Sequence, residues 1–189
     1  MDLRAKTMLL LVASAILLLA IPTGVDAGCC CPTFWTAFDR HCYRLFSQNL
    51  TWSDAETFCQ TYTVPSLGGG LASMDTLAHL VSVHSHAEQN FINILYETSR
   101  KKDDTIGGLW LGIHDLTTEG EFKWSDGSDI DYTAWAPRQP DASTTNSDCG
   151  VIRSGAARIY PGLWRDGPCV QPPSGVVHYF ICKLQIWSN

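Results

Sequence analysis

The stretch RQPDASTTNSDC at positions 138–149 collects side chains that can bind a polar ligand. The amide of Gln139 both donates and accepts hydrogen bonds, whereas the carboxylate of Asp141 only accepts them. Carboxylate and amide oxygens are also the ligands that calcium takes in proteins. The residue types therefore suit a site for calcium and a polar ligand such as a sugar, or the remains of such a site, and we keep both interpretations open at this point.

These residues lie in a region that is poor in regular structure. From Asp129 to Pro173 the chain is rich in Pro, Gly, Ser and Asp, which is typical of surface loops. Loops longer than about 15 residues are uncommon in domains unless they are functional or disordered. We therefore expect any binding site to lie between Asp129 and Pro173.

Two helices are predicted before this looped region, over 51–62 and 85–100. Each begins with a capping box, in which a serine is followed three residues later by a glutamate; the two boxes are Ser53 with Glu56, and Ser85 with Glu88. The residues expected on the buried faces are Trp52, Ala55, Cys59 and Tyr62 in the first helix, and Phe91, Ile94 and Leu95 in the second.

Short apolar or alternating runs predict strands. Their ranges are 80–83, 109–114, 121–127, with a turn at Asp126-Gly127, and 178–185. The three tryptophans Trp110, Trp124 and Trp135 are expected to be core residues. Two early helices followed by strands and long loops predict an α+β domain.

The N-terminus reads as a secretory signal peptide over residues 1–27. Arg4 and Lys6 precede an apolar run from Met8 to Ile21, and a small-residue cleavage site ends at Ala27. The run is shorter than the roughly 20 residues that a bilayer span needs. The remaining residues, 28–189, suit a single domain, and secretion is the predicted fate of the protein.

Charge and cysteine content narrow the class of function. The formal net charge is −6, which argues against nucleic acid and anionic membranes as partners. Eight cysteines in a secreted chain predict disulfides. The sequon Asn49-Leu50-Thr51 is a candidate glycosylation site.

Two kinds of chemistry have weak support. His79, His84 and His86 have a spacing that suggests zinc, but a capped helix start explains them as well. The chain contains no nucleophile elbow, H-E-x-x-H motif or P-loop, so we do not expect an enzyme.

Several signatures occur in an order that resembles the C-type lectin-like domain in its long form. They are CPTFWTAFDRHCYRLF (31–46), TWSDAETFCQ (51–60), WLGI (110–113) and EGEFKWSDGSDIDYTAW (119–135). The opening GCC-P-T-F-W and the run D-L-T-T-E-G-E-F-K-W are most similar to secreted echinoderm lectins of the echinoidin type. The resemblance covers residues 28–189 and implies a disulfide-stapled α+β fold with two helices, small antiparallel sheets and a long-loop region.

The resemblance also implies a pairing for six cysteines: Cys31 with Cys42, Cys59 with Cys182, and Cys149 with Cys169. Cys29 and Cys30 are left over. Pairing with another chain, which would give a disulfide-linked homo-oligomer, is the favoured outcome. A strained bond between the two cysteines, or capping by a small thiol, is the alternative.

In sugar-binding members of this family, one calcium ion and a sugar share a set of loop ligands. The resemblance maps this set onto Gln139 and Asp141, on either side of a cis proline, and onto Asp166. The Gln-Pro-Asp order implies galactose-type rather than mannose-type sugars. An aromatic residue that could stack on the sugar is not adjacent to the motif, and Tyr160 or Trp164 could serve only if the loops bring them close.

The implied ligand set is incomplete. Ser147 stands where the family has a glutamate, and Arg165 stands where it has an asparagine. Two unit charges of the same sign 4 Å apart repel each other by about 4 kcal/mol at an effective dielectric of 20. We therefore expect Arg165 to modulate or disable the ion, either by repulsion or by pairing with Asp141 or Asp166, unless Asn146 and Asp148 supply substitute oxygens.

A second calcium site of the family is also incomplete in this chain. Asp115 and Glu119 match two of its ligands, whereas Ala142 and Ser147 occupy the other two positions.

Two functions follow from the sequence. The first is a secreted lectin that binds galactose-type glycans, with calcium as the cofactor that the resemblance implies and with agglutination or innate immune recognition as its role. The second is a calcium-independent module that uses the same scaffold to bind a protein or a mineral surface.

Overall fold

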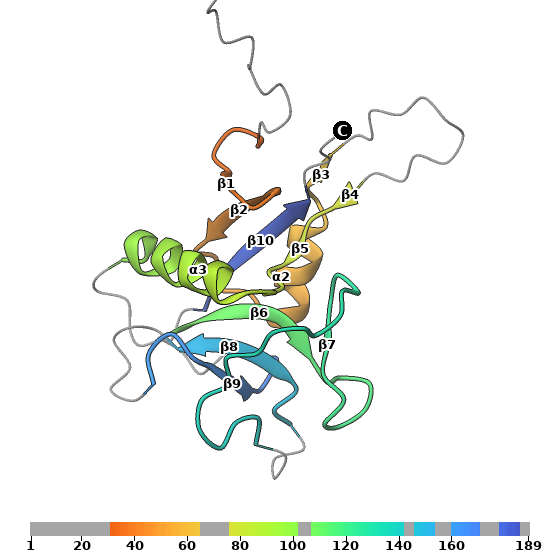
Figure 1. The fold of residues 1–189 in the computed structure, drawn as a ribbon. Coiled ribbons are helices and arrows are strands. Elements are labelled where there is room, and N and C mark those ends of the chain that lie inside the picture. Colours follow the sequence, from red (N-terminus) through yellow and green to blue (C-terminus); the bar gives the residue numbers. More distant parts are fainter. Residues whose placement is uncertain are drawn as a thin grey trace, which may run out of the picture.

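One mixed sheet organises the molecule in the computed structural model (Figure 1). The structure describes residues 31–64, 76–101, 107–141, 146–153, 160–170 and 178–185. The expected signal peptide, residues 1–27, and the cysteines Cys29 and Cys30 lie outside this range. No helix among the described residues is long and apolar enough to cross a membrane.

The strands of this sheet follow the order β1-β2-β10-β6-β8-β9, and β5 and β7 pair with β10 and β6. The bounds are Thr36–Phe38 (β1), His41–Phe46 (β2), His79–Leu80 (β5), Gly108–His114 (β6), Lys123–Trp124 (β7), Cys149–Arg153 (β8), Trp164–Gly167 (β9) and Tyr179–Gln185 (β10). A separate pair is formed by Thr63–Val64 (β3) and Thr76–Leu77 (β4). All pairings are antiparallel except that of β10 with β6, which is parallel.

The two helices cover opposite faces of the sheet. Helix α2 (Trp52–Cys59) packs with one cluster of buried residues, and helix α3 (His86–Ser99) packs with the other. Successive residues of β6 alternate between the clusters, with Trp110 on the side of α2 and Leu109 and Leu111 on the side of α3. We call these sides the α2 face and the α3 face. The predicted α+β class is confirmed.

Helix α2 begins differently from the prediction. Its N-cap is Thr51, whose hydroxyl accepts a hydrogen bond from the Asp54 N–H at 3.1 Å, so the capping box of Ser53 and Glu56 is wrong. Glu56 instead points into the protein and is 8% exposed. The predicted face is confirmed for Trp52, Ala55 and Cys59, which are buried, and Tyr62 is half-buried beyond the helix end.

Helix α3 begins as predicted but buries a different stripe. Ser85 is the N-cap and accepts from the Glu88 N–H at 3.1 Å, while the Glu88 carboxylate accepts from the His84 N–H at 2.8 Å. Ile94 is 64% exposed, so its predicted burial is wrong. Phe91 and Leu95 are half-buried, and the fully buried residues are Glu88, Gln89, Ile92 and Tyr96. The helix is rotated toward its polar partners in the core.

The strand predictions hold in their centres. Strands β6 and β10 cover 109–114 and 178–185 almost completely. Only the first residue of the predicted strand 80–83 belongs to a strand, because β5 ends at Leu80, yet Val81 and Val83 are fully buried. Trp110 and Trp124 are buried as expected, and Trp135 is half-buried against the α3-face cluster.

The three implied disulfides are all present. Cys31–Cys42 closes the N-terminal hairpin, Cys59–Cys182 joins α2 to β10, and Cys149–Cys169 joins β8 to the segment after β9. Cys59 and Cys182 are 123 residues apart in the sequence. By loop-closure entropy, a bond over such a separation destabilises the unfolded chain by about 5 kcal/mol.

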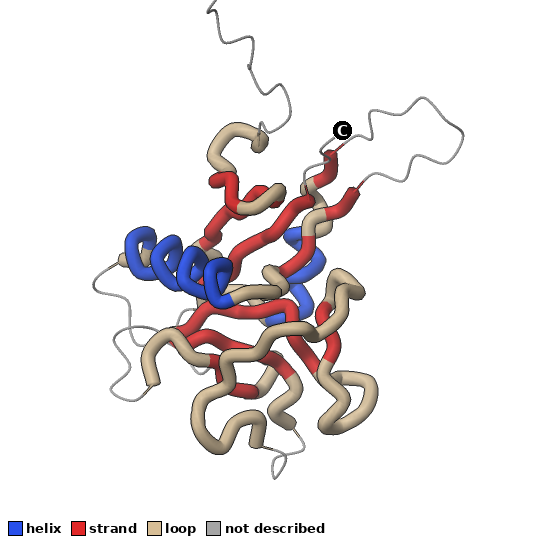
Figure 2. Tube along the Cα trace, in the orientation of Figure 1, coloured by secondary structure: helices blue, strands red, loops and turns tan. Residues whose placement is uncertain are grey.

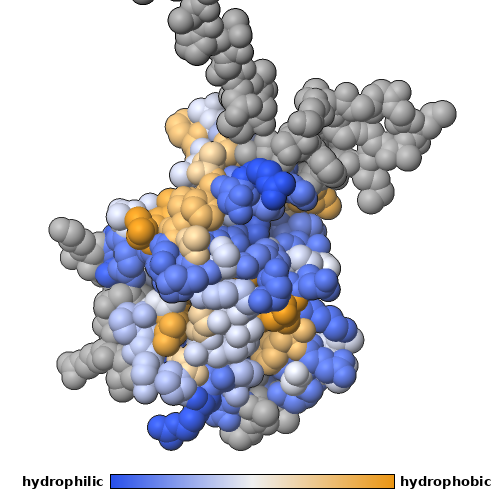
Figure 3. Space-filling view, viewed as in Figure 1, coloured by the Kyte–Doolittle hydropathy of each residue, from blue (hydrophilic) through white to orange (hydrophobic). Residues whose placement is uncertain are grey.

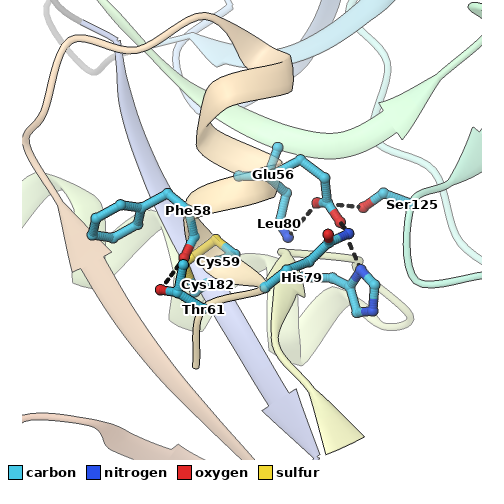
Figure 4. The surroundings of a disulfide bond; sticks show 9 residues. Glu56, Phe58, Cys59, Thr61, His79, Leu80, Ser125 and Cys182 are labelled. Atoms are coloured by element: carbon cyan, nitrogen blue, oxygen red, sulfur yellow. Dashed lines mark hydrogen bonds and ion pairs between the residues drawn. A yellow bond between two sulfur atoms is a disulfide. The ribbon is translucent and has the colours of Figure 1, made fainter. Parts of the chain in front are cut away.

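Beside this disulfide, Glu56 joins α2 to two other segments (Figure 4). Its carboxylate lies 2.6 Å from His79 Nδ1, accepts from the Leu80 N–H at 2.9 Å and accepts from the Ser125 hydroxyl at 2.9 Å. These bonds hold the pKa of Glu56 below its usual value even though burial acts in the opposite direction, and the pKa of His79 is raised by its bond to Glu56.

A second buried ion pair joins α3 to β10. Lys183 Nζ lies 2.7 Å from Glu88 Oε1, and both side chains are less than a tenth exposed. Tyr43 of β2 donates to the same carboxylate at 2.6 Å, and Lys183 also donates to the carbonyl oxygen of Ser82 at 3.1 Å. This hydrogen-bonded group, the Glu88–Lys183 node, therefore connects α3, β2, β10 and the segment after β5.

The Glu56 contacts predict a measurable loss of stability. Glu56→Gln should lower the free energy of unfolding by about 1–3 kcal/mol, because it weakens several buried hydrogen bonds at once. Since the pKa of Glu56 is lowered, the stability that its ionised carboxylate contributes is present above the usual pKa of glutamate and is lost as the pH falls. Since the pKa of His79 is raised, its contribution is present below pH ~6.5 and is lost as the pH rises. The stability difference should therefore be largest at about pH 5–6.

Urea unfolding of wild type and Glu56→Gln between pH 4 and pH 8 measures this difference in the free energy of unfolding. The exposed Glu121 provides the matched control Glu121→Gln, which should change stability by less than about 0.5 kcal/mol. Equal effects of the two substitutions would contradict the role assigned to Glu56.

Candidate functional site

The loop before the Gln-Pro-Asp motif is attached to the outer edge of β9. Ala136 N–H donates to the carbonyl oxygen of Trp164, and Trp164 N–H donates to that of Ala134, both at 2.8 Å. These bonds give a short parallel bridge between Trp135 and Trp164. Because β9 is otherwise the last strand of the sheet, its free edge is what holds this loop in place, at the end of the molecule drawn mostly as loop in Figure 2.

The motif itself is fixed by two hydrogen bonds to Asp166. Gln139 Oε1 accepts from the Asp166 N–H at 3.0 Å, and Asp166 Oδ2 accepts from the Asp141 N–H at 3.0 Å. The peptide bond between Gln139 and Pro140 is cis, as the resemblance implied. The structure therefore brings together the three residues that sequence comparison with the family proposed as ligands, from positions 25 to 27 residues apart.

Helix α3 supports β9 from beneath. Trp164 is fully buried, and its Nε1–H donates to Gln89 Oε1 at 2.6 Å. The amides of Gln89 and Asn93 donate to the carbonyl oxygen of Gly162 at 3.3 and 3.4 Å. Sequence reasoning missed both amides, since two amides spaced four residues apart on a helix ordinarily predict an exposed face.

Negative charge gathers around Asp166. Its side chain is buried, and burial raises the pKa of the carboxyl. Hydrogen bonds to backbone N–H groups lower this pKa, whereas the charges of Asp141 and Asp115 raise it further. Partial desolvation together with the charges of Asp115, Asp148 and Asp166 also raises the pKa of Glu119.

Asp115 is the most constrained of these acids. It is 4% exposed; Oδ2 accepts from the Gly120 N–H at 2.8 Å, while Oδ1 is buried and has no hydrogen-bond partner among the described residues. Its N–H donates to the carbonyl oxygen of Asp148 at 3.1 Å. A buried carboxylate oxygen with no donor is costly unless a cation or water satisfies it.

The remaining predicted positions fall around this acidic group. Ser147 and Asp148 are half-buried before β8, and Asn146 is exposed. Ala142 lies outside the described residues. Tyr160 is 44% exposed and Trp164 is fully buried, so Trp164 does not offer a ring to a sugar.

Arg165 is not brought into the group. Side chains alternate along a strand, so Arg165 lies on the α2 face while Trp164 and Asp166 lie on the α3 face. Its Nη1 would be 3.3 Å from a Cβ placed on Gly167, the next residue on that face. Among the described residues Arg165 forms no ion pair with Asp141 or Asp166. The contact that would let it replace the ion is therefore not made in this structure.

The histidines proposed as an alternative zinc site have separate partners. His79 contacts Glu56, and His84 Nδ1 lies 2.8 Å from Asp131 Oδ1. His86 is exposed at the first residue of α3. Across the described part of the chain, no three or more His, Cys, Asp or Glu side chains form a group that could hold a metal. An ion near Asp166 would thus need amide, hydroxyl or backbone oxygens as well.

The fold and the Gln-Pro-Asp loop on the edge of β9 define a class of protein. A family model described as "Lectin C-type domain" matches residues 48–184, so this chain belongs to the C-type lectin domain family. Among curated relatives, echinoidin of Heliocidaris crassispina is 49% identical over 160 residues, covering 84% of this chain and 99% of echinoidin. The chain is thus an echinoidin-type member, and it is not an enzyme.

Other relatives show the range of the family. The alpha-N-acetylgalactosamine-specific lectin of Patiria pectinifera is 38% identical over 153 residues, covering 79% of this chain and 77% of that lectin. The solved structure of the C-type lectin CEL-I from Cucumaria echinata matches with a TM-score of 0.66 and 33% identity, covering 83% and 99% of the two chains. The solved structure of a calcium-independent type II antifreeze protein matches with a TM-score of 0.61 and 26% identity, covering 84% of this chain and 96% of that protein.

The residues at the loop end fit a divalent cation on two counts. Asp115 Oδ1 is buried with no donor among the described residues, and the pKa values of Asp166 and Glu119 are raised in an acidic neighbourhood without a described cationic partner. Both are the signs of carboxylates that need positive charge. Because no three described acids form one group, neutral oxygens such as Gln139 Oε1 beside Asp166 would have to supply the rest of the ligands.

The electrostatics predict how pH acts on this site. Because the pKa of Asp166 is raised in the folded protein, ionising it costs stability as the pH rises from its usual value to the folded one. Asp166→Asn keeps an oxygen for the Asp141 N–H and removes this cost. In EDTA, the stability of the variant relative to wild type should therefore increase between pH 4 and pH 7. Thermal unfolding across this range, with Asp129→Asn at an exposed position as control, measures the difference; parallel curves for wild type and Asp166→Asn would refute it.

Proposed function

We propose that this protein is a secreted lectin that binds galactose-type sugars through Gln139, Asp141 and Asp166, with calcium held by the same residues. The observation that carries the proposal is the hydrogen bonding of Asp166 with Gln139 and Asp141, which fixes the side chains of Gln139 and Asp166 and the backbone of Asp141 across two separate segments. When bound, calcium would supply a positive centre for two sugar hydroxyls.

The donor and acceptor pattern supports galactose-type sugars. Gln139 can donate through Nε2 and accept through Oε1, while Asp141 only accepts. In the structure Gln139 Oε1 is already used by the Asp166 N–H, and Nε2 contacts the carbonyl oxygen of Arg138 at 3.3 Å, a long bond that a sugar oxygen can replace. A relative of this chain is named for its specificity toward alpha-N-acetylgalactosamine.

Calcium-independent binding of a protein or a mineral surface is the second candidate function. It is favoured by Ser147 in the place of an acidic ligand. A solved relative with the same fold is named as calcium-independent. In this alternative the scaffold is kept, and the acidic loop end contacts a partner directly.

Assembly and processing complete the proposal. Signal peptide cleavage after Ala27 would leave Cys29 and Cys30 close to the new N-terminus, where they would join chains into a covalent homo-oligomer. Several weak sugar sites in one oligomer can raise the overall affinity by 10²–10⁴. This supports a role in agglutination or innate recognition. The sequon at Asn49 lies between β2 and α2, and Asn49 is exposed, as a glycan acceptor must be.

Affinity chromatography separates the two candidate functions. Passed over galactose and mannose resins with calcium, the protein should be retained on galactose and released by EDTA. Asp141→Asn combined with Gln139→Glu should move retention toward mannose, because the exchange reverses the donors and acceptors. Asp129→Asn combined with Glu121→Gln removes exposed charge elsewhere and should leave retention unchanged. Flow-through on both resins would favour the calcium-independent module.

The covalent oligomer is tested by gel electrophoresis of the secreted protein. Non-reducing gels should show a dimer or larger species, and reducing gels a monomer. Cys29→Ser with Cys30→Ser should run as a monomer in both, while binding to a single immobilised sugar weakens because avidity is lost. A monomer band for wild type without reductant would rule out the interchain bond.

A further inference from the structure

The α2 face of the sheet carries a second concentration of charge, opposite in sign to the acidic loop end. Arg165 on β9 pairs in register with Val151 on β8, and Arg153 follows two residues later on the same face. Val151 in turn pairs with Trp110 on β6. Side chains on diagonal positions of neighbouring strands come within reach of one another when they are long. The two guanidinium groups are therefore neighbours.

The environment of Arg165 is unfavourable to its charge. Its side chain is half-buried, and burial together with the positive charge of Arg153 lowers the pKa of the guanidinium. The charge of Asp166 acts in the opposite direction, but that carboxylate lies on the other face. Arg165 has neither an ion pair nor a side-chain hydrogen bond to any described residue.

His178 adjoins this arginine and offers no negative charge. Burial and the charge of Arg165 lower the pKa of His178 to about 4, so the imidazole is neutral at pH 7. The ring is 5% exposed and stacks on Trp110 with centroids 4.3 Å apart. Its Nδ1 is buried and has no hydrogen-bond partner among the described residues. A polar group capable of one more hydrogen bond thus lies beside Arg165, which forms no ion pair with the part of the chain that the structure describes.

The sequence around Arg165 supplies little negative charge. Between Val151 and His178 the chain contains Arg153, Arg158 and Arg165 but a single acid, Asp166. A half-buried cation without a counter-ion costs free energy, and the like charge of a second arginine adds to the cost. A bound external anion would offset both the cost of burying the charge and the repulsion between the two arginines.

We propose that Arg165, with Arg153 and His178 beside it, forms a calcium-independent binding site for a sulfate group. The guanidinium is planar and presents parallel N–H donors, a geometry that matches the oxygens of an oxoanion in a bidentate contact. A sulfate group is fully ionised at neutral pH, and its two sources outside a cell are the free ion and sulfate esters on polysaccharides. This site lies on the α2 face, and the proposed sugar site lies across β9 from it.

The absence of a Cβ at Gly167 is part of this site. A Cβ at this position would lie 3.3 Å from Arg165 Nη1, closer than most Cβ contacts, and 3.8 Å from Cζ. Glycine at position 167 therefore leaves room for the guanidinium along β9.

Thermal unfolding in EDTA tests the proposal without involving calcium or galactose. Sodium sulfate should raise the Tm of wild type above the value in sodium chloride of equal ionic strength. Sulfate also stabilises folded proteins in general by exclusion from their surface. The matched control Arg40→Gln, at an exposed arginine of the β1–β2 turn, keeps this general effect and the same change in net charge. Arg165→Gln should lose the excess rise in Tm that wild type and Arg40→Gln both show.

A second measurement tests whether the substitution itself destabilises the fold. Without sulfate, Arg165→Gln should be at least as stable as wild type, because it removes one of two neighbouring like charges. A marked drop in its Tm would show that Arg165 has a counter-ion inside the protein, and would overturn the proposal. So would equal sulfate responses in Arg165→Gln and Arg40→Gln.

Binding to dextran sulfate, with neutral dextran as the blank, distinguishes the two sources. We expect the affinity of wild type for dextran sulfate in EDTA to fall at least fivefold in Arg165→Gln and to stay within twofold in Arg40→Gln. If the Tm responds to inorganic sulfate as stated, this fall assigns the site to sulfate esters as well. Equal losses in both variants would show attraction by net charge alone and would overturn the site. Loss of galactose binding, by contrast, leaves all these results unchanged.

Discussion

The buried ion pair of Glu88 and Lys183 is the contact on which the arrangement of the fold depends. It joins α3 to β10 at 2.7 Å inside the core, where an unpaired charge is strongly unfavourable. Removing either partner from such a pair generally costs about 3–5 kcal/mol. Tyr43 and Ser82 complete the hydrogen bonds of the pair, so β2 and the segment after β5 are fixed by the same node. From Ser82 the contacts continue through Asp126 to the loops that follow β7.

The position of α3 then decides the geometry of the candidate site. Glu88 fixes the start of the helix, and the next residue, Gln89, receives the indole N–H of Trp164. Trp164 anchors β9, whose outer edge carries the loop before Gln139. The surface around these elements is largely hydrophilic, with separate apolar patches, on the face shown in Figure 3. Order in the loops therefore comes from backbone bonds to one edge strand, from a buried amide beneath it, and from the rings of Tyr132 and Trp135, which pack against Trp164.

Much of the fold could be predicted from the sequence, because periodic apolar runs and cap residues are local signals. Strands β6 and β10 and the cap at Ser85 are of this kind. The errors have one physical origin. The apolar pattern predicts Glu56 at a helix cap and gives no sign that Glu88 and Gln89 are buried, because the partners of these polar residues lie far away in the sequence. Their burial turned α3 and left Ile94 exposed.

The candidate site was predictable in part for a similar reason. Gln139, Asp141 and Asp166 come from a recognisable motif and a fixed strand, and the structure joins them. The family resemblance implies that Arg165 belongs to the same site, because it matches a ligand position of the family. Neighbouring side chains of a strand point to opposite faces, so Arg165 lies across β9 from Asp166. The supporting amides Gln89 and Asn93 had no sequence signal, since their role exists only once Gly162 and Trp164 are beside them.

The strict alternation of β9 has a consequence for how this protein can change over evolutionary time. Residues 165 and 166 are adjacent in the sequence, yet they contribute to two surfaces that share no side chain. Substitutions at 165 and 167 can accumulate on one side of the strand while the partners of Asp166 stay as they are. A single four-residue strand thus lets a lineage alter one surface without first giving up the other, and a one-residue insertion in it would exchange the two.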